Sequence, residues 1–159
     1  MAPNSSILSV YRTESQSGVD YIWLLNGANT TASFVANFQE VNDVRPFSLN
    51  TWTEDVRPIA QYSLSNTRVQ IPLKLQPYET TVISFMPSTG KRPPWVTKTT
   101  DNIEAVGYTT SGRLFASLKG PSMITVRGTT ERSLNFSVPP STSLNLWDLE
   151  IQDWRENPN

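Results

Sequence analysis

The sequence predicts an all-β fold: an antiparallel β-sandwich, immunoglobulin-like or jelly-roll-like, with little or no helix. Apolar residues recur mostly at every second position, which is the period of a half-buried strand. Short apolar runs follow one another at intervals of about 8–12 residues, separated by turn-forming residues. Charged residues make up only 17% of the chain, as suits an extracellular β domain. The length of 159 residues predicts a single module over residues 1–159.

The best-defined early strand is Val19–Asn26, which is apolar on both faces and is therefore expected to be central in its sheet. Trp23 is flanked by apolar residues and is expected in the core. Asn26-Gly27 supplies a turn, and Thr31–Gln39 then resumes the alternation. We therefore expect a β-hairpin over roughly residues 19–39.

A second clear strand is Thr67–Leu75, in which apolar and polar residues alternate strictly. Pro72 lies on its outward-facing side and cannot donate to a ladder, which indicates an edge strand or a bulge. The other strands are expected at Ile7–Arg12, Val56–Ser63, Thr80–Met86, Ile103–Thr109, Arg113–Leu118, Ser122–Arg127 and Ser133–Val138.

Two segments allow more than one interpretation. The Pro-rich stretch 87–94 either divides the chain into halves or forms a linker that crosses between sheets, and the crossover is favoured. In residues 143–154, one alternation fits a strand and another fits a helical stripe. A strand is favoured because the rest of the chain is β. Residues 143–159 are also expected to begin, or to contact, a following domain.

Several classes of function are excluded by composition. The chain has no cysteine and no histidine, which removes thiol catalysis, Ser-His triads and nearly all transition-metal sites, so no metal and no cofactor is expected. The net charge of −1 without a basic stripe argues against nucleic acid. No apolar run approaches the ~20 residues of a membrane span. Sequons at Asn4, Asn29 and Asn135 favour a secreted, extracellular glycoprotein.

A resemblance emerges from the order of several motifs. These are the strand DYIWLLN, the corner Trp52-Thr53 after Pro46–Leu49, the run from Arg57 to Tyr62, and Leu75–Ile83 with its Pro and Glu-Thr-Thr. They resemble the β-sandwich modules of large secreted, fungal-type glycoside hydrolases of the α-L-rhamnosidase-like and family-2-like kind. The family pattern usually has Gly after Trp-Thr, where this chain has Glu54.

The resemblance implies an accessory, non-catalytic module that positions neighbouring catalytic or sugar-binding domains. The chain would then not be an enzyme on its own, and its partners would be neighbouring domains of a larger polypeptide. The run 146–154 is similar to the entry into a following jelly-roll domain, so Trp147 and Trp154 are expected in interdomain packing.

The sequence leaves two alternative functions open. The first is an independent carbohydrate-binding module that binds a plant or fungal polysaccharide through flat aromatic side chains. The candidates, which lie near loops or strand ends, are Trp52, Tyr62, Trp95 and Tyr108. Packing in the core is the competing role of each of them. A small glycosidase would need two facing carboxyl groups, for which Glu54-Asp55 and Asp148 with Glu150 are the candidates. Solvated turns and the polar side of a strand explain these carboxylates more simply, so no catalytic residue is expected.

Overall fold

The fold was analysed in a computed structural model that describes residues 6–39, 44–65, 67–87 and 92–138. Within these residues every regular element is a β-strand, and the strands form antiparallel sheets. The prediction of an all-β antiparallel sandwich with little or no helix is therefore confirmed. The segment 143–154, whose type the sequence left open, lies outside the described residues, as do Trp147 and Trp154.

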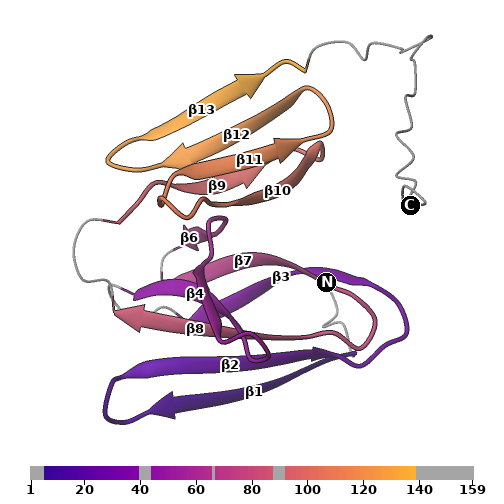
Figure 1. The fold of residues 1–159 in the computed structure, drawn as a ribbon, viewed down its shortest axis with the longest axis vertical. Coiled ribbons are helices and arrows are strands. Elements are labelled where there is room, and N and C mark those ends of the chain that lie inside the picture. Colours follow the sequence, from indigo (N-terminus) through magenta and orange to yellow (C-terminus); the bar gives the residue numbers. More distant parts are fainter. Residues whose placement is uncertain (1–5, 40–43, 66, 88–91, 139–159) are drawn as a thin grey trace, which may run out of the picture.

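Two sheets form a sandwich in the lower half of Figure 1. The large sheet contains, in spatial order, β1 (Ile7–Glu14), β2 (Val19–Asn26), β8 (Thr80–Pro87), β4 (Val44–Asn50) and β5 (Asp55–Pro58). The small sheet contains, in spatial order, β3 (Ala32–Gln39), β7 (Arg68–Leu75) and β6 (Ser63–Ser65). The central position of β2, between β1 and β8, agrees with its apolar sequence.

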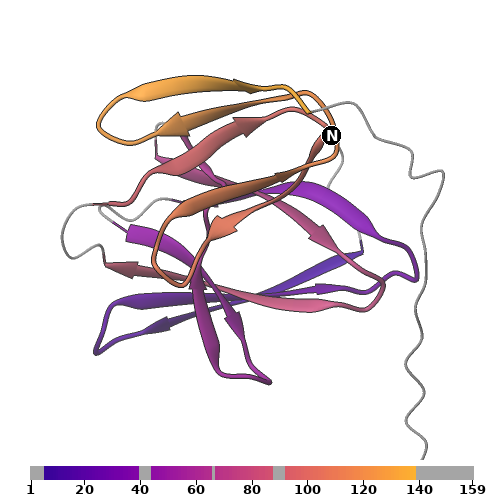
Figure 2. The same cartoon turned by 45° about the horizontal axis from the view of Figure 1, so that its top comes forward.

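The chain after residue 94 forms a second group of strands in the upper half of Figure 1, and Figure 2 shows the same group after a turn of 45°. It consists of the sheet β13 (Glu131–Phe136), β12 (Ser122–Arg127) and β9 (Trp95–Thr99), and of the hairpin β10 (Ile103–Tyr108) with β11 (Leu114–Leu118). A short parallel bridge joins this group to the sandwich. Val96 N donates to Ala60 O at 2.8 Å, and Tyr62 N donates to Val96 O at 3.0 Å.

The core lies between the large and small sheets and extends to β9. The large sheet supplies the inward-facing side chains of β2, β8 and β4, and the small sheet supplies those of β7. Tyr62 and Trp95 complete the same cluster. Its buried members are Ile22, Leu24, Val44, Tyr62, Val69, Ile71, Leu75, Ile83, Phe85 and Trp95.

The hairpin expected over residues 19–39 is wrong. β2 pairs with β1 and β8, whereas β3 pairs with β7 in the other sheet. The physical reason is that Asn26 does not simply close a local turn: its side-chain Nδ2 donates to Leu75 O at 3.3 Å and Gln76 O at 3.0 Å. These bonds hold the chain where it crosses from one sheet to the other.

Most of the other predicted strands are present within a few residues of the expected bounds. The single strand expected at Val56–Ser63 is wrong, because β5 ends at Pro58 and the next residues turn away to bridge Val96. β4 and β9 were not predicted as strands. Pro72 behaves as expected. β6 pairs only with residues Arg68–Gln70 of β7, so the side of β7 that faces β6 has no partner strand at Pro72.

Candidate functional site

One row of outward-facing side chains on the large sheet is apolar across all five strands. Directly opposite residues in a ladder point to the same face, so the register defines rows of side chains. One row consists of Val10, Trp23, Val82, Leu49 and Val56, from β1 to β5. Val10 and Val56, at the two edges, are 57% and 50% exposed, and the three between them are half-buried.

Neighbouring rows extend this surface. Tyr21 and Phe47 lie in one adjacent row, which also contains buried Ser84 between them and Arg12 at the β1 edge. Leu8 and Leu25 lie opposite each other in the row on the other side, followed by Thr80. We call the surface made by Leu8, Val10, Tyr21, Trp23, Leu25, Phe47, Leu49, Val56 and Val82 the apolar face. None of these residues belongs to the core cluster, whose members from the large sheet all point the opposite way.

The outward-facing surface of the small sheet, in contrast, is mostly polar. Its outward positions are Ser33, Val35, Asn37 and Gln39 in β3 and Arg68, Gln70, Pro72 and Lys74 in β7. Six of these eight residues are polar or charged. The sandwich therefore has one polar outer surface and one apolar outer surface.

Trp23 was expected in the core, and the structure places it elsewhere. It is half-buried and lies in the middle of the apolar face, with Val10 and Val82 directly opposite it. The expectation failed because a strand that is apolar on both sides is normally covered on both of its faces, which would place Trp23 in the core. Within the described residues, only the face that carries Ile22 and Leu24 contributes to the core.

Trp52 lies in the turn between β4 and β5 and is 91% exposed. The turn is well ordered by hydrogen bonds: Asn50 Oδ1 accepts from Trp52 N at 3.0 Å and from Thr53 N at 3.3 Å. Glu54 has a φ of 58°, a left-handed conformation that glycine adopts more easily. Glu54 therefore adopts a left-handed conformation at the position where the resembled family usually has Gly.

Tyr62 and Trp95 are both buried, and their rings stack on each other with centroids 5.3 Å apart and an interplanar angle of 4°. Each ring covers one flat face of the other, and both side chains are buried, so neither residue presents a ring face to which a sugar could bind. Core packing, the competing role, accounts for both residues. The sequence placed them beside prolines and loops, and the bridge between Ala60 and Val96 brings them together.

Tyr108, the remaining aromatic candidate, is half-buried in β10, and its hydroxyl donates to Pro94 O at 2.8 Å. Burial, and to a smaller extent nearby Tyr62, raise the pKa of Tyr108 to about 12, against a lowering effect of Arg45. Burial likewise raises the pKa of Tyr62, against Arg92 and Arg45. Both phenols are therefore neutral hydrogen-bonding groups at physiological pH.

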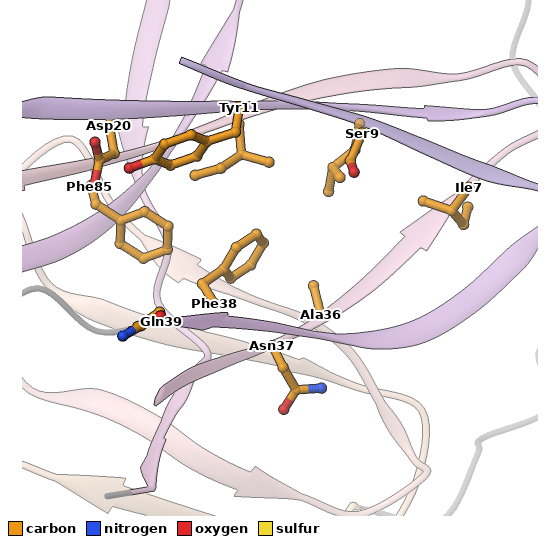
Figure 3. Close-up of a pocket in the computed structure, with 11 residues that line it drawn as sticks. Ile7, Ser9, Tyr11, Asp20, Ala36, Asn37, Phe38, Gln39 and Phe85 are labelled. Atoms are coloured by element: carbon orange, nitrogen blue, oxygen red, sulfur yellow. The ribbon is translucent and has the colours of Figure 1, made fainter. Parts of the chain in front are cut away.

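Two concavities accompany these residues. A side groove of about 670 Å³ opens between the sheet edges β1 and β3, and Figure 3 shows Tyr11, Phe38 and Phe85 around it. Asp20 also lines this groove and accepts from Thr13 Oγ1 at 2.8 Å. A larger groove of about 1,030 Å³ lies between the sandwich and the β10–β11 hairpin, and Tyr108 is among its lining residues. We call it the junction groove.

The candidate carboxylates have ordinary surroundings. Asp55 Oδ2 accepts from Arg57 Nη2 at 2.8 Å and from Thr53 Oγ1 at 3.1 Å on an exposed hairpin. Asp148 and Glu150 lie outside the described residues. The described part of the chain contains no group of three or more Asp or Glu residues arranged to hold a metal ion, and no helix in that part is long and apolar enough to cross a membrane.

No family model and no curated protein matches this chain. Among solved structures, the chain is similar to a rhamnosidase from Novosphingobium sp. PP1Y, with 16% sequence identity and a TM-score of 0.45. The match covers 75% of this chain and only 13% of the rhamnosidase chain.

Proposed function

We propose that this chain is a non-catalytic accessory β-sandwich module of a secreted glycoside hydrolase, and that its apolar face packs against a neighbouring domain of the same polypeptide. The apolar face carries the proposal. The kind of parent protein is suggested by the motifs around Trp52-Thr53, Arg57–Tyr62 and Leu75–Ile83, which resemble accessory modules of such enzymes.

The size of the apolar face fits an interdomain contact. Five strands spaced by about 4.8 Å, and rows about 6.8 Å apart, span roughly 19 by 14 Å, or a few hundred Å². That area, roughly 270 Å², lies just below the roughly 300–600 Å² of the largest apolar patch on a typical soluble monomer, which is often a functional surface. Interfaces between domains of one chain bury roughly 600–1,500 Å², so this patch would form the centre of such an interface.

The energetics favour covering this face. Burying one Val, Leu or Phe side chain completely stabilises by roughly 1.5–3 kcal/mol, and each partly exposed residue of the face would gain a fraction of that. The gain is spread over nine residues from five strands. A neighbouring domain that is already tethered would capture this gain at little entropic cost, because its effective concentration is high.

Single cysteines test the proposal, since the chain has none of its own. Val10→Cys and Val56→Cys report on the apolar face, and Val35→Cys is the matched control because Val35 is a valine 55% exposed on the small sheet. In the isolated chain all three thiols should react rapidly with a soluble alkylating reagent. In the full polypeptide of the parent reading frame, the first two should react at least tenfold more slowly, as measured by peptide mass spectrometry.

Two results would overturn this proposal. Equal reactivity of all three cysteines in the full polypeptide would show that nothing covers the apolar face. A reading frame that encodes no further domain would remove the partner altogether. Hydrolysis of aryl glycosides is measured separately, and the proposal requires activity in the full polypeptide and none in the isolated chain.

A further inference from the structure

The junction groove is bounded by three parts of the chain. Its floor is aliphatic and includes Ile71, Leu73 and Ile83, one wall is the β4–β5 hairpin, and the other is the β10–β11 hairpin. A smaller pocket of about 230 Å³ shares Ser48, Asp55 and Arg57 with it and adds Asn50. The two concavities therefore form one path that runs from the β10–β11 hairpin to the turn that carries Trp52.

The polar groups of this path are mostly uncharged. Hydroxyl groups of Ser48, Thr81, Thr109 and Thr110 and the amide of Gln61 line the junction groove. Among the described residues that line it, only Asp55 and Arg57 are charged, and they form an ion pair at 2.8 Å. The groove thus offers many hydrogen-bonding groups and no surplus charge, which disfavours phosphate-bearing and other strongly charged ligands.

An exposed aromatic ring stands at the wall of the groove. Phe115 is 43% exposed and lies opposite Gly107 in the β10–β11 ladder. Its ring covers the glycine so closely that a Cβ at Gly107 would lie 2.9 Å from two ring carbons. The absence of a side chain at Gly107 therefore sets the position of the ring, and any substitution there must displace it.

We propose that the junction groove binds an uncharged, hydroxyl-rich ligand, namely a neutral oligosaccharide. The ring of Phe115 contacts an apolar sugar face, and hydroxyl and amide groups bond its hydroxyls. The Asp55–Arg57 pair supplies one acceptor and several donors. The volume of about 1,030 Å³ stands at the upper end of the roughly 300–1,000 Å³ of small-molecule sites, so it accommodates more than a small monosaccharide.

This site is independent of the proposed docking function. Ser48, Arg57 and Ile83 lie in one row of the large sheet and point away from the apolar face, and the two surfaces meet only along the edge strand β5. Loss of sugar binding would therefore leave the protection of Val10→Cys unchanged, and loss of docking would leave sugar binding unchanged.

Affinity electrophoresis of the isolated chain tests the proposal, with soluble β-glucan, galactomannan and arabinan as neutral probes and polygalacturonate as the charged probe. At least one neutral probe should retard the wild type. Phe115→Ala should weaken binding at least tenfold, and Gly107→Ala and Arg57→Gln should weaken it several-fold while thermal unfolding shows each variant folded. Tyr11→Ala is the matched control, because it removes an exposed aromatic ring from the side groove and should bind normally.

Retardation by none of the neutral probes would overturn the proposal. So would a loss with Tyr11→Ala equal to that with Phe115→Ala, because the aromatic contact would then not be specific to the junction groove. Binding confined to polygalacturonate, or competition for the groove by extended peptides but not by sugars, would assign it to a different class of ligand. Gly107→Ala keeps the phenyl group, so it tests ring position even if Phe115→Ala unfolds.

Discussion

Asn26 is the residue on which the crossover between the two sheets depends most directly. Its side chain is fully buried. Nδ2 donates to Thr30 O at 2.7 Å, Gln76 O at 3.0 Å and Leu75 O at 3.3 Å, and Oδ1 accepts from Ala28 N at 3.1 Å. One amide therefore ties the β2–β3 connection to the end of β7.

Asn26→Asp changes one atom of this arrangement and keeps its shape. The Nδ2 group, which donates to three carbonyl oxygens, is replaced by a carboxylate oxygen that can only accept. The hydrogen bond from Ala28 N to Oδ1 can still form. A net hydrogen bond contributes about 1 kcal/mol, and each buried polar group left unsatisfied costs about 1–3 kcal/mol. We expect a loss of about 3–4 kcal/mol in the free energy of unfolding, and a fall in Tm of roughly 6–16 °C.

Urea unfolding followed by tryptophan fluorescence measures this loss, with Asn29→Asp as the control. Asn29 lies in the same connection between β2 and β3 and is exposed, so its substitution by Asp makes the same chemical change without removing a buried donor. The control should change stability by no more than about 0.5 kcal/mol. A loss below about 1 kcal/mol for Asn26→Asp, or equal losses for the two variants, would refute the structural role assigned to Asn26.

Two further predictions concern aromatic residues. Because folding raises the pKa of Tyr108 to about 12 and also raises that of Tyr62, the unfolded chain releases these protons first, near the usual phenol pKa of about 10. The free energy of unfolding should therefore be unaffected by these groups below pH ~10 and fall as the pH rises towards ~12. In Tyr108→Phe this fall should be less steep than in the wild type. Alkaline unfolding measures it, and identical pH profiles for the variant and the wild type would contradict the prediction. Trp52→Ala should leave the free energy of unfolding within about 0.5 kcal/mol, because the side chain is 91% exposed, and a larger loss in urea titration would show a packing role.

Most strands could be predicted from the sequence, with β4 and β9 as exceptions, but their partners could not. Alternation in β7 and in β2 is local, and each strand is where the pattern indicates. The expected hairpin failed because an Asn-Gly turn between two alternating runs is also compatible with a change of sheet. What decides between them is the bonding of Asn26 to Leu75 and Gln76, about fifty residues away, which no local pattern reports.

The same limit applies to the candidate sugar-binding residues. Tyr62 and Trp95 are separated by more than thirty residues; Tyr62 was expected near a strand end, and Trp95 follows Pro93-Pro94. The structure stacks them because a backbone bridge at Val96 joins the two groups of strands. Trp52, by contrast, lies in a short hairpin turn set by Asn50, and its exposure follows from local residues alone. Local turns were predictable, and contacts between distant segments were not.

The sequence of β2 nevertheless contained the argument for a partner. In β7 three of the four outward residues are polar, whereas in β2 Tyr21, Trp23 and Leu25 face outward. Each strand lies between two others in its sheet, although β6 covers only the first half of β7, so position alone does not explain the difference. An apolar outward side on an inner strand gains stability when something covers it, and no described strand packs over this one. The two-sided apolarity of β2 therefore fits two interfaces: the core with the small sheet on one side and, on the other, the proposed docked domain.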